Sequence, residues 1–598
     1  MKKVYLSLLL MTGLSTLSNA QLNLGGIPWS LELASKDAVS DAASAPIVLK
    51  ALDFDKALKD AELLDAKGGM YKSAIGTDAN ITLASGHFTY LENGRMIWRT
   101  TVQLPGAKAV KPFYKTFRLP VGVSLYVSNA NGKQVIGAFN HLSNNERNIL
   151  GHQMVQGDVV VFEMDIDAGV NVSDIQFDVS KLFGVYRGGM LDVISSEYGS
   201  DAAVVETVQL GAADTCHVNA KCPAATNWDI LGKTVAHIFI YDGGSTAGFC
   251  SGNLINNTSN DCRPLLLTAS HCDDANAMVD SLFDHWEFTF GFQYSTCYNV
   301  GTPPENKVLT GANFVARSPY PTDQVGASYP ALIGDFLLLE LRDESNQLAG
   351  WDTYLGGWDR RTTIDDTVWV GFHHPAGDVK KFSKSTQMSA SGTFNQSAIT
   401  NTHWYTTKYT VGGVEGGSSG SALFKGTTGR IIGDLSGGNS SSAVCGSSRY
   451  SLYSKLSFNW EYMYGDTTAA TQLKSHLDPA GTDVEYLDMA QIGTSTCTTT
   501  GFTLGSTAIS DANAVESCLY LYPNPSNGMV RVKYNSNFNT VLIFNVYNTL
   551  GAVVKTFKIS ATSKEYLLDM TDLVSGVYMV SVKDSNNNTV NKKIVISR

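Results

Sequence analysis

The chain has 598 residues, and its 44 Lys plus Arg against 55 Asp plus Glu give a formal charge of −11 and a pI near 5.5. At roughly 100–200 residues per domain, this length requires several domains. Only 17% of residues are charged and 55 are glycine, which argues against a disordered chain or a coiled coil and favours short strands and turns. The acidic balance, with no basic stripe, excludes a nucleic-acid partner.

Residues 1–20 have the pattern of a secretory signal peptide. Lys2 and Lys3 precede an apolar run over 4–14, and small residues over 18–20 precede a cut before Gln21. No later stretch reaches about 18 uninterrupted apolar residues, so we expect no transmembrane segment. The compartment is then oxidising, and the nine cysteines, all after residue 215, are expected to form disulfides. We expect no metal site, because CxxC and HExxH patterns are absent.

Residues 21–210 contain no cysteine and have mainly β patterning. The pair Asn131-Gly132 separates apolar runs at 124–127 and 135–136, which is a strong hairpin signal. Residues 159–162 are a second predicted strand. We therefore expect a β-rich domain here.

Residues 211–492 contain many glycines and short apolar runs, a pattern typical of a two-lobed antiparallel β structure, with helix only near 469–477. Residues 493–518 are small and polar, which predicts a linker. Residues 519–598 return to β patterning, with strands expected at 541–547, 577–582 and 594–596. The predicted fold class is mostly β and multidomain.

A histidine follows one of these apolar runs. Residues 265–269 lead into Ser270, His271 and Cys272, and Cys250 lies 22 residues before Cys272. Imidazole titrates near neutral pH, as a base for a serine nucleophile must. A disulfide between the two cysteines would hold this loop, with about 3 kcal/mol in the chain-entropy model. We expect His271 to be a general base.

Asp335 and Ser419 complete a Ser-His-Asp set in the chain order His, Asp, Ser. Asp335 begins a strongly apolar run, where an unpaired charge would be costly, and we expect it to orient His271. Ser419 lies in a Gly/Ser loop at 416–422. Such a loop lets backbone N–H groups converge, and we expect those of Gly417 and Ser419 to form an oxyanion hole.

The same loop also fits G-x-S-x-G with Ser418 at its centre, the motif of α/β hydrolases. That fold needs a following helix and a downstream acid and histidine. Only His476 lies downstream, and residues 435–438 indicate loop and strand. We therefore reject this alternative.

Residues 211–490 resemble chymotrypsin-fold serine peptidases, and most closely the bacterial lysyl endopeptidase family. The resemblance rests on the histidine and serine loops and on four further motifs, namely Asn256-Asn257-Thr258, Tyr294-Ser295-Thr296-Cys297, Gly357-Trp358-Asp359-Arg360-Arg361 and His373-His374-Pro375. It implies a two-lobed β-barrel serine endopeptidase that needs no cofactor. It also implies disulfides Cys216–Cys445, Cys222–Cys297 and Cys250–Cys272. We add Cys497–Cys518 as a fourth pair, which leaves Cys262 unpaired, and we expect His373 and His374 to make structural hydrogen bonds.

The substrate pocket departs from the family pattern. The family's pocket carboxylate, histidine and tryptophan correspond here to Ser451, Ser436 and either Phe394 or Asn395. The expected substrate-binding residues are Gly413, Glu415, Ser436, Gly437, Gly438 and Ser451. Without a counter-charge a buried ammonium is costly, so we expect neutral or apolar P1 residues. Glu415 matches a family carboxylate and keeps Lys/Arg specificity as the alternative.

The expected cleavage site of maturation supports the same preference for neutral or apolar P1 residues. The resemblance places the mature start near Gly211, yet no Lys or Arg occurs over 188–220. Cleavage after Leu210 suits an apolar pocket. Digestive relatives pair a new N-terminal ammonium with an Asp before the nucleophile, but here Ser418 stands there. We expect residues 21–210 to be a propeptide that covers the cleft or assists folding.

Residues 519–598 resemble the C-terminal sorting domain of the type IX secretion system, from the motifs at 522–528, 547–551, 573–578 and 592–596. The implied fold is a β-sandwich, and the implied location is the surface or exterior of a Gram-negative bacterium. A carbohydrate-binding or spacer sandwich is the alternative. The expected partners are protein substrates and the secretion machinery, for a monomer. An adhesin that uses an inactive peptidase scaffold is a further alternative for the whole chain.

Overall fold

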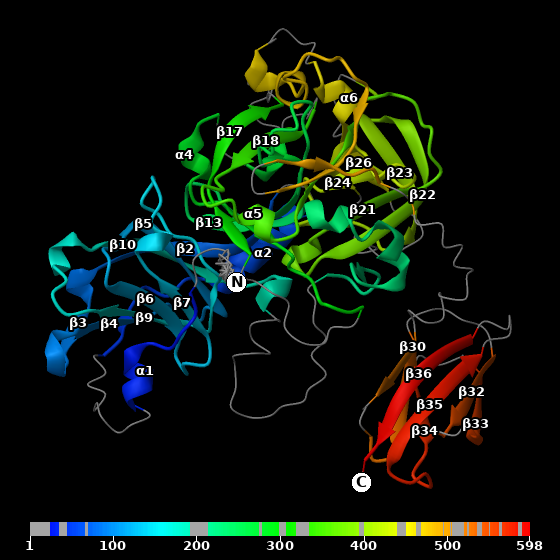
Figure 1. The fold of residues 1–598 in the computed structure, drawn as a ribbon, viewed down its shortest axis with the longest axis horizontal. Coiled ribbons are helices and arrows are strands. Elements are labelled where there is room, and N and C mark those ends of the chain that lie inside the picture. Colours follow the sequence, from blue (N-terminus) through cyan, green and yellow to red (C-terminus); the bar gives the residue numbers. More distant parts are fainter. Residues whose placement is uncertain are drawn as a thin grey trace, which may run out of the picture.

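The computed structural model confirms a mostly β, multidomain fold (Figure 1). The described residues are 24–34, 45–65, 70–191, 213–273, 278–297, 307–318, 334–393, 400–438, 450–461, 468–493, 496–502, 504, 519–522, 526–534, 541–548, 551–560, 565–583 and 589–597. The predicted signal peptide lies outside them, as do Phe394, Asn395, Cys445 and Cys518. Among the helices so described, none is long and apolar enough to cross a bilayer.

Residues 24–191 form two β-sheets around one core, which includes Trp98, Phe117 and Phe162. The first sheet contains β1 (Ile47–Val48), β4 (Met96–Gln103), β9 (Val159–Ile166), β6 (Val123–Asn129) and β7 (Val135–Phe139), with β3 (His87–Tyr90) beside β4. The second contains β2 (Tyr71–Thr82), β10 (Gln176–Val185), β5 (Ala109–Arg118) and β8 (Val155–Gln156). The helices are α1 (Trp29–Ala34) and α2 (Phe54–Asp65). The predicted hairpin is confirmed, because β6 pairs antiparallel with β7 and Gly132 turns at φ +68°.

The first lobe of the next unit is an antiparallel sheet whose strands are largely buried. Its strands are β12 (Val235–Tyr241), β13 (Thr246–Leu254), β14 (Leu265–Ala269), β15 (Glu287–Phe290), β16 (Val308–Thr310), β17 (Ala312–Arg317) and β18 (Phe336–Leu341). The short helices are α4 (Asp280–Phe283) and α5 (Gln347–Gly350). The continuous apolar run of β14 is explained by burial of every residue in the strand.

The second lobe is also antiparallel for most of its length. Its strands are β20 (Trp358–Asp359), β21 (Trp369–His373), β22 (Lys381–Gly392), β23 (His403–Val411), β24 (Ala422–Lys425), β25 (Ile431–Gly438), β26 (Ser451–Lys455) and β27 (Tyr486–Leu487), and β11 (Val218–Asn219) joins β22. Helices α6 (Leu456–Asn459) and α7 (Lys474–Leu477) follow, with a 3₁₀ turn at Ala469–Thr471. The helix predicted near 469–477 is thus a 3₁₀ turn followed by one α-turn.

The chain then returns to the first lobe. Strands β19 (Tyr354–Leu355), β28 (Ala490–Gln491) and β29 (Thr498–Thr499) form a small sheet, and Phe502 packs against the peptidase core. Ordered structure therefore continues past 492, into the start of the predicted linker.

This return brings Cys497 to Cys262, and the two form a disulfide with Cα atoms 5.4 Å apart. The predictions that Cys497 pairs with Cys518 and that Cys262 is unpaired are wrong. The partners are 235 residues apart in sequence, and Cys497 directly precedes β29, which reaches the first lobe through β28 and β19.

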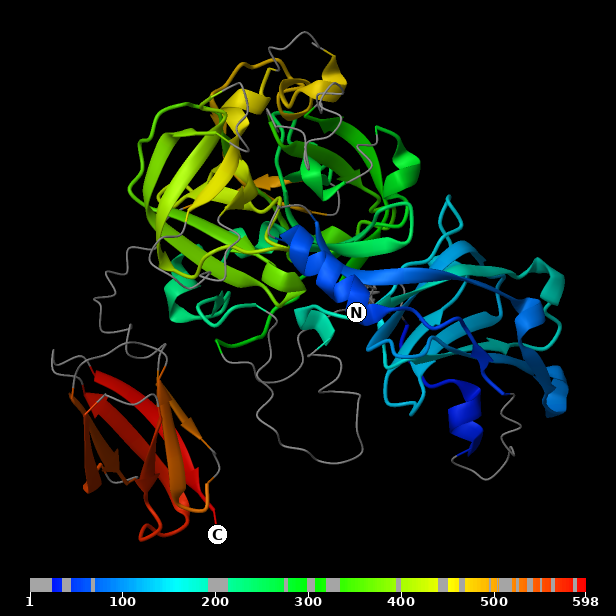
Figure 2. The ribbon, with the colours of Figure 1, turned by 180° about the vertical axis from the view of Figure 1, so that it is seen from behind.

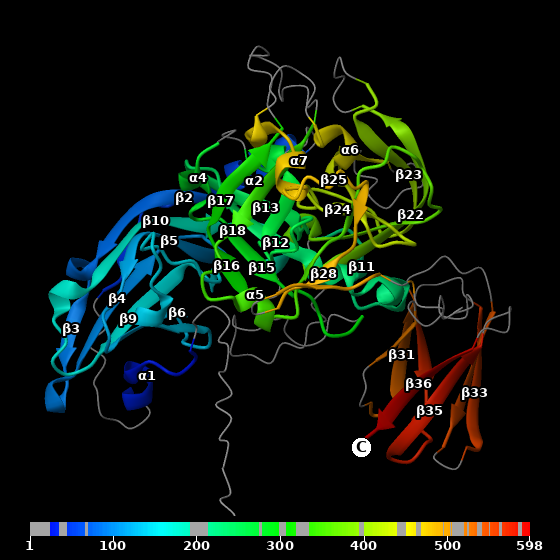
Figure 3. The ribbon, with the colours of Figure 1, turned by 45° about the horizontal axis from the view of Figure 1, so that its top comes forward.

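The last unit is a two-sheet sandwich (Figure 3). One sheet contains β30 (Leu519–Tyr522), β31 (Met529–Tyr534) and β34 (Glu565–Asp569), and the other contains β33 (Val553–Ser560), β32 (Val541–Tyr547), β35 (Gly576–Lys583) and β36 (Thr589–Ile596). Alternate residues such as Phe544, Val546, Val580 and Val582 fill the core. The predicted sandwich and its three strands are confirmed.

One strand of the first unit extends the peptidase sheet. Strand β2 pairs antiparallel with β13, with Tyr71 opposite Phe249 and Ile75 opposite Thr246. Seen from behind, α2 and β2 lie against the peptidase unit (Figure 2). The 21–210 region and the peptidase therefore share one continuous 11-stranded sheet.

Candidate active site

Strand pairing brings His271 and Asp335 together. Strands β14 and β18 pair antiparallel with Ala269 opposite Phe336, so the residues beyond these ends emerge side by side. His271 Nδ1 lies 2.7 Å from Asp335 Oδ2, and the backbone N–H of His271 donates to Asp335 Oδ1 at 3.0 Å. Both side chains are buried. With Nδ1 facing the carboxylate, this arrangement is compatible with the expected role of His271 as a base acting through Nε2.

Residues that the sequence did not single out support this pair. Ser454 Oγ accepts a hydrogen bond from Asp335 N–H at 3.0 Å. Arg317, which is only 1% exposed, donates to Asp273 Oδ2 at 2.6 Å and to Ser270 O at 2.9 Å. Arg317 therefore holds Ser270 and Asp273, which lie on either side of His271 in the sequence. Its only signal in the sequence is a cation at the end of an apolar strand.

Ser251 on β13 joins the serine loop to the histidine strand. Its N–H donates to Ser419 O at 2.8 Å, and its Oγ donates to Gly417 O at 2.9 Å. Its carbonyl accepts from Thr268 Oγ1 at 2.8 Å, three residues before His271. The predicted nucleophile and the predicted base are thus held on the same strand residue.

Close backbone contacts fix the conformation of the serine loop at Gly416 and Gly417. Gly416 O accepts from Ala376 N–H at 2.6 Å, so the N–H of Gly417, on the opposite side of this peptide, faces away from residue 376. Gly417 has φ +89°, and a Cβ there would lie 2.8 Å from His374 O. Only glycine fits this position.

The neighbouring histidines are structural, as predicted. His373 Nδ1 lies 2.8 Å from Ser418 Oγ, and His374 Nδ1 lies 2.9 Å from Asp378 O. Burial lowers the pKa of His373 to about 3, so it is neutral at physiological pH. In the described part of the chain, no group of three or more His, Cys, Asp or Glu side chains is arranged to hold a metal ion.

Two of the disulfides implied by the resemblance are present. Cys250–Cys272 joins β13 to the residue after His271, and Cys222–Cys297 joins the start of the unit to the first lobe. Cys216 is also disulfide-bonded. Its predicted partner, Cys445, lies outside the described residues.

Four of the predicted pocket residues lie on β25 and β26, and Gly413 and Glu415 lie after the end of β23. Gly437 and Gly438 pair with Leu452 and Ser451. The hydroxyls are engaged, since Ser451 Oγ accepts from Tyr409 OH at 2.8 Å and Ser436 Oγ lies 3.0 Å from His403 Nε2. Gly413 is buried, and the Glu415 carboxylate accepts a hydrogen bond from Asp214 N–H at 3.1 Å.

A second carboxyl, Asp434, lies near Asp335 and was not predicted. It is 1% exposed, and burial, followed by the charge of Asp335, raises its pKa well above the usual range. Because burial disfavours its ionised form, Asp434 is poorly suited to supply a counter-charge for a basic substrate side chain.

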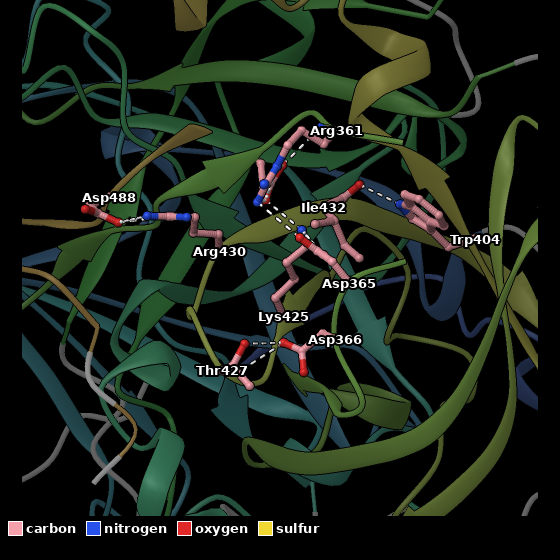
Figure 4. A network of polar contacts seen from close by, with 10 residues as sticks. Arg361, Asp365, Asp366, Trp404, Lys425, Thr427, Arg430, Ile432 and Asp488 are labelled. Carbon is pink, nitrogen blue, oxygen red and sulfur yellow. Dashed lines mark hydrogen bonds and ion pairs between the residues drawn. The ribbon is translucent and has the colours of Figure 1, made fainter. Parts of the chain in front are cut away.

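A buried ionic network holds the hairpin that follows Ser419 (Figure 4). Lys425 at the end of β24 lies 2.7 Å from Asp359 Oδ2, and Arg361 contacts the same carboxylate. Burial alone would raise the pKa of Asp359, but hydrogen bonds from the two cations hold it below its usual value. The Gly357–Arg361 motif thus anchors the hairpin formed by β24 and β25 through Asp359.

The start of β2 lies against the serine loop. Because a Cβ on Gly416 would be only 2.9 Å from Tyr71 Cδ2, the Tyr71 ring packs directly on this glycine. Met70 is buried in the cluster that contains Cys250 and Cys272. Arg187 lies over the Tyr71 ring at 3.9 Å and donates to Lys72 O at 2.6 Å, which fixes the strand end.

A buried ion pair also links the two units. Lys111 Nζ on β5 lies 2.5 Å from Glu287 Oε2 on β15, with side chains 6% and 9% exposed. Burial raises the pKa of Glu287, and Lys111 opposes this shift. The pair is thus an electrostatic anchor between the first unit and the peptidase.

Comparisons with known proteins find matches for two parts of the chain. Residues 210–454 match the family model "Lysyl endopeptidase, C-terminal domain". The predicted resemblance to lysyl endopeptidases is confirmed. Residues 520–597 match the model "Secretion system C-terminal sorting domain", which confirms the second resemblance and indicates export to the cell surface or beyond.

A lysyl endopeptidase of Pseudomonas aeruginosa is 26% identical over 284 residues, which cover 45% of this chain and 52% of that protein. The chain thus matches about half the length of this curated relative. Among solved structures, Rv3671c from M. tuberculosis H37Rv has 12% identity and a TM-score of 0.24 over 40% of this chain and 90% of that one. HL collagenase has 13% identity and a TM-score of 0.24 over 38% and 92%.

Proposed function

We propose that the chain is a secreted serine endopeptidase that hydrolyses peptide bonds in proteins. The observation that carries this proposal is the His271–Asp335 pair, which Ser251 links to the loop that contains Ser419. Ser419 Oγ attacks the carbonyl carbon, and its proton passes to His271 Nε2. The oxyanion accepts hydrogen bonds from the N–H groups of Gly417 and Ser419. His271 then protonates the leaving amine, and water hydrolyses the acyl-enzyme by the same route. No cofactor takes part.

The pocket favours a neutral or apolar P1 side chain. Ser436 and Ser451 offer only hydroxyls, burial disfavours the ionised form of Asp434, and Glu415 accepts a hydrogen bond from Asp214 N–H. Burying an ammonium among these groups would lack the ion pair that offsets its desolvation.

Residues 21–210 act as a propeptide that covers the site. Strand β2 adds to β13 as an edge strand, the mode in which peptidases bind extended substrates. Tyr71 on Gly416, together with Met70 in the core cluster that also contains Cys250 and Cys272, would exclude a substrate from this side. Residues 519–598 direct export by the type IX machinery, and the mature enzyme is a monomer.

Peptide-library cleavage by the secreted protein tests both activity and P1 preference. We expect cuts after Leu, Met or aromatic residues, and none by the Ser419→Ala variant. Cleavage restricted to Lys and Arg would support the alternative specificity, and equal cleavage by both forms would refute the serine mechanism.

A further inference from the structure

We propose that Glu415 is a positioning residue, which ties the loop carrying Ser419 to the first residues of the peptidase unit and so keeps the Gly417 N–H in place for the oxyanion. This inference rests on the proposed peptidase function. In this role the Glu415 carboxylate affects the rate of catalysis. It does not select substrates with a basic side chain.

The carboxylate of Glu415 is engaged by the start of the unit. Glu415 Oε1 accepts from the backbone N–H of Asp214 at 3.1 Å and lies 3.4 Å from His217 Nε2. The side chain is 16% exposed. These contacts link two segments that lie 201 residues apart in the sequence.

The backbone of Glu415 transmits this link to the serine loop. Glu415 O accepts from Ser418 N–H at 3.0 Å, and Glu415 N–H donates to Ser418 Oγ at 3.3 Å. His373 Nδ1 lies 2.8 Å from the same Oγ. Ser418 directly precedes Ser419, and Gly417 lies inside this closed turn. A displacement of Glu415 would therefore shift both oxyanion donors.

The link is present in the uncleaved chain. In the uncleaved chain, residue 214 follows the propeptide. The group that donates to the Glu415 carboxylate is therefore the backbone N–H of Asp214, not the ammonium of an N-terminus made by cleavage. Ser418, at the position before the nucleophile, carries no charge to bind such an ammonium. The oxyanion hole is therefore set before cleavage, and latency arises from the strand β2 that covers it.

The experiment compares wild type, Glu415→Ala and Glu415→Gln in the secreted enzyme, with quenched-fluorescence casein as substrate. We expect Glu415→Ala to lower kcat about 10- to 100-fold with KM within twofold, since outright loss of an oxyanion donor costs about 10²–10³. Glu415→Gln keeps an oxygen that can accept from Asp214 N–H and should recover most of kcat. The control is Glu344→Ala, on the exposed surface of the first lobe, with unchanged kcat.

Each result decides the proposal. If Glu415→Ala is folded by circular dichroism and keeps wild-type kcat, or raises KM only for substrates with Lys or Arg at P1, the proposal is overturned. If Glu415→Ala does not fold, the decision passes to Glu415→Gln and to capping of the new N-terminal amine with 2-pyridinecarboxaldehyde. Both should leave kcat within about threefold, and a collapse on capping would show an ammonium-dependent switch instead. Failure of the wild type to hydrolyse casein would refute the peptidase function itself.

Discussion

Replacing Lys111 by methionine tests whether the first unit holds the peptidase in a covered state. Methionine has a similar length but no charge, so Glu287 loses its partner at 2.5 Å. The penalty applies only while the units are docked, because release returns the carboxylate to water. The substitution should therefore shift the equilibrium towards the uncovered enzyme.

Protonation of Glu287 sets an upper limit to this penalty. The carboxyl has an ordinary pKa of 4.5, and each pH unit above that value costs about 1.4 kcal/mol to protonate it. The limit is about 3.4 kcal/mol at pH 7, a factor of about 300, but only about 0.7 kcal/mol at pH 5, a factor of about 3. The effect should thus depend strongly on pH.

The assay is the rate at which a fluorophosphonate labels the uncleaved full-length chain, expressed as the ratio of variant to wild type at each pH. We expect a ratio of up to about 300 at pH 7 and about 3 at pH 5. Lys108→Met, which changes an exposed lysine of the same unit, should give a ratio near 1 at both. A ratio near 1 for Lys111→Met at pH 7, or equal large ratios at both pH values, would refute the reasoning.

Three further substitutions probe other contacts. Tyr71→Ala removes the ring from Gly416, at a cost of about 3 kcal/mol to docking, and should speed labelling about 100-fold at pH 5 and pH 7 alike; a pH-dependent effect would contradict this. Cys497→Ser should lower the free energy of unfolding by roughly 2–4 kcal/mol in denaturant titrations and release one thiol at Cys262; unchanged stability would count against the crosslink. Burial raises the pKa of Glu415 to about 7 from 4.5, so the folded state binds the proton more tightly and loses stability as pH rises from 4.5 to 7. The charged groups that act on this carboxylate include Asp214, Asp378 and Lys381, and the titratable side chain of His217 lies 3.4 Å from it. Glu415→Gln should remove this loss, with a gain of about 3 kcal/mol at pH 8 relative to pH 4, and equal curves for both proteins would refute it.

Local patterns in the sequence were sufficient to predict the fold class and the strands that hold the proposed catalytic residues. The apolar runs at 265–269 and 336–341 indicated the strands that hold His271 and Asp335, and pairing of these strands brings the two side chains together. The Asn-Gly hairpin and the C-terminal strands followed from turn chemistry and alternation. In each case the signal lies within about ten residues.

Contacts between distant segments could not be predicted in this way. The Cys262–Cys497 disulfide depends on the return of the chain to β19, and the β2–β13 pairing depends on how the first unit docks. A glutamate four residues before a serine does not reveal whether its carboxylate faces a pocket or Asp214. These features follow from the arrangement of whole sheets, which local propensity does not encode.

Mapping the fluorophosphonate adduct on the secreted protein by mass spectrometry tests the central claim most directly. The account predicts one adduct, on Ser419, that is lost in Ser419→Ala and formed more than about 10²-fold more slowly in His271→Ala. An adduct on Ser418 or on another residue, or labelling that persists in Ser419→Ala, would contradict it.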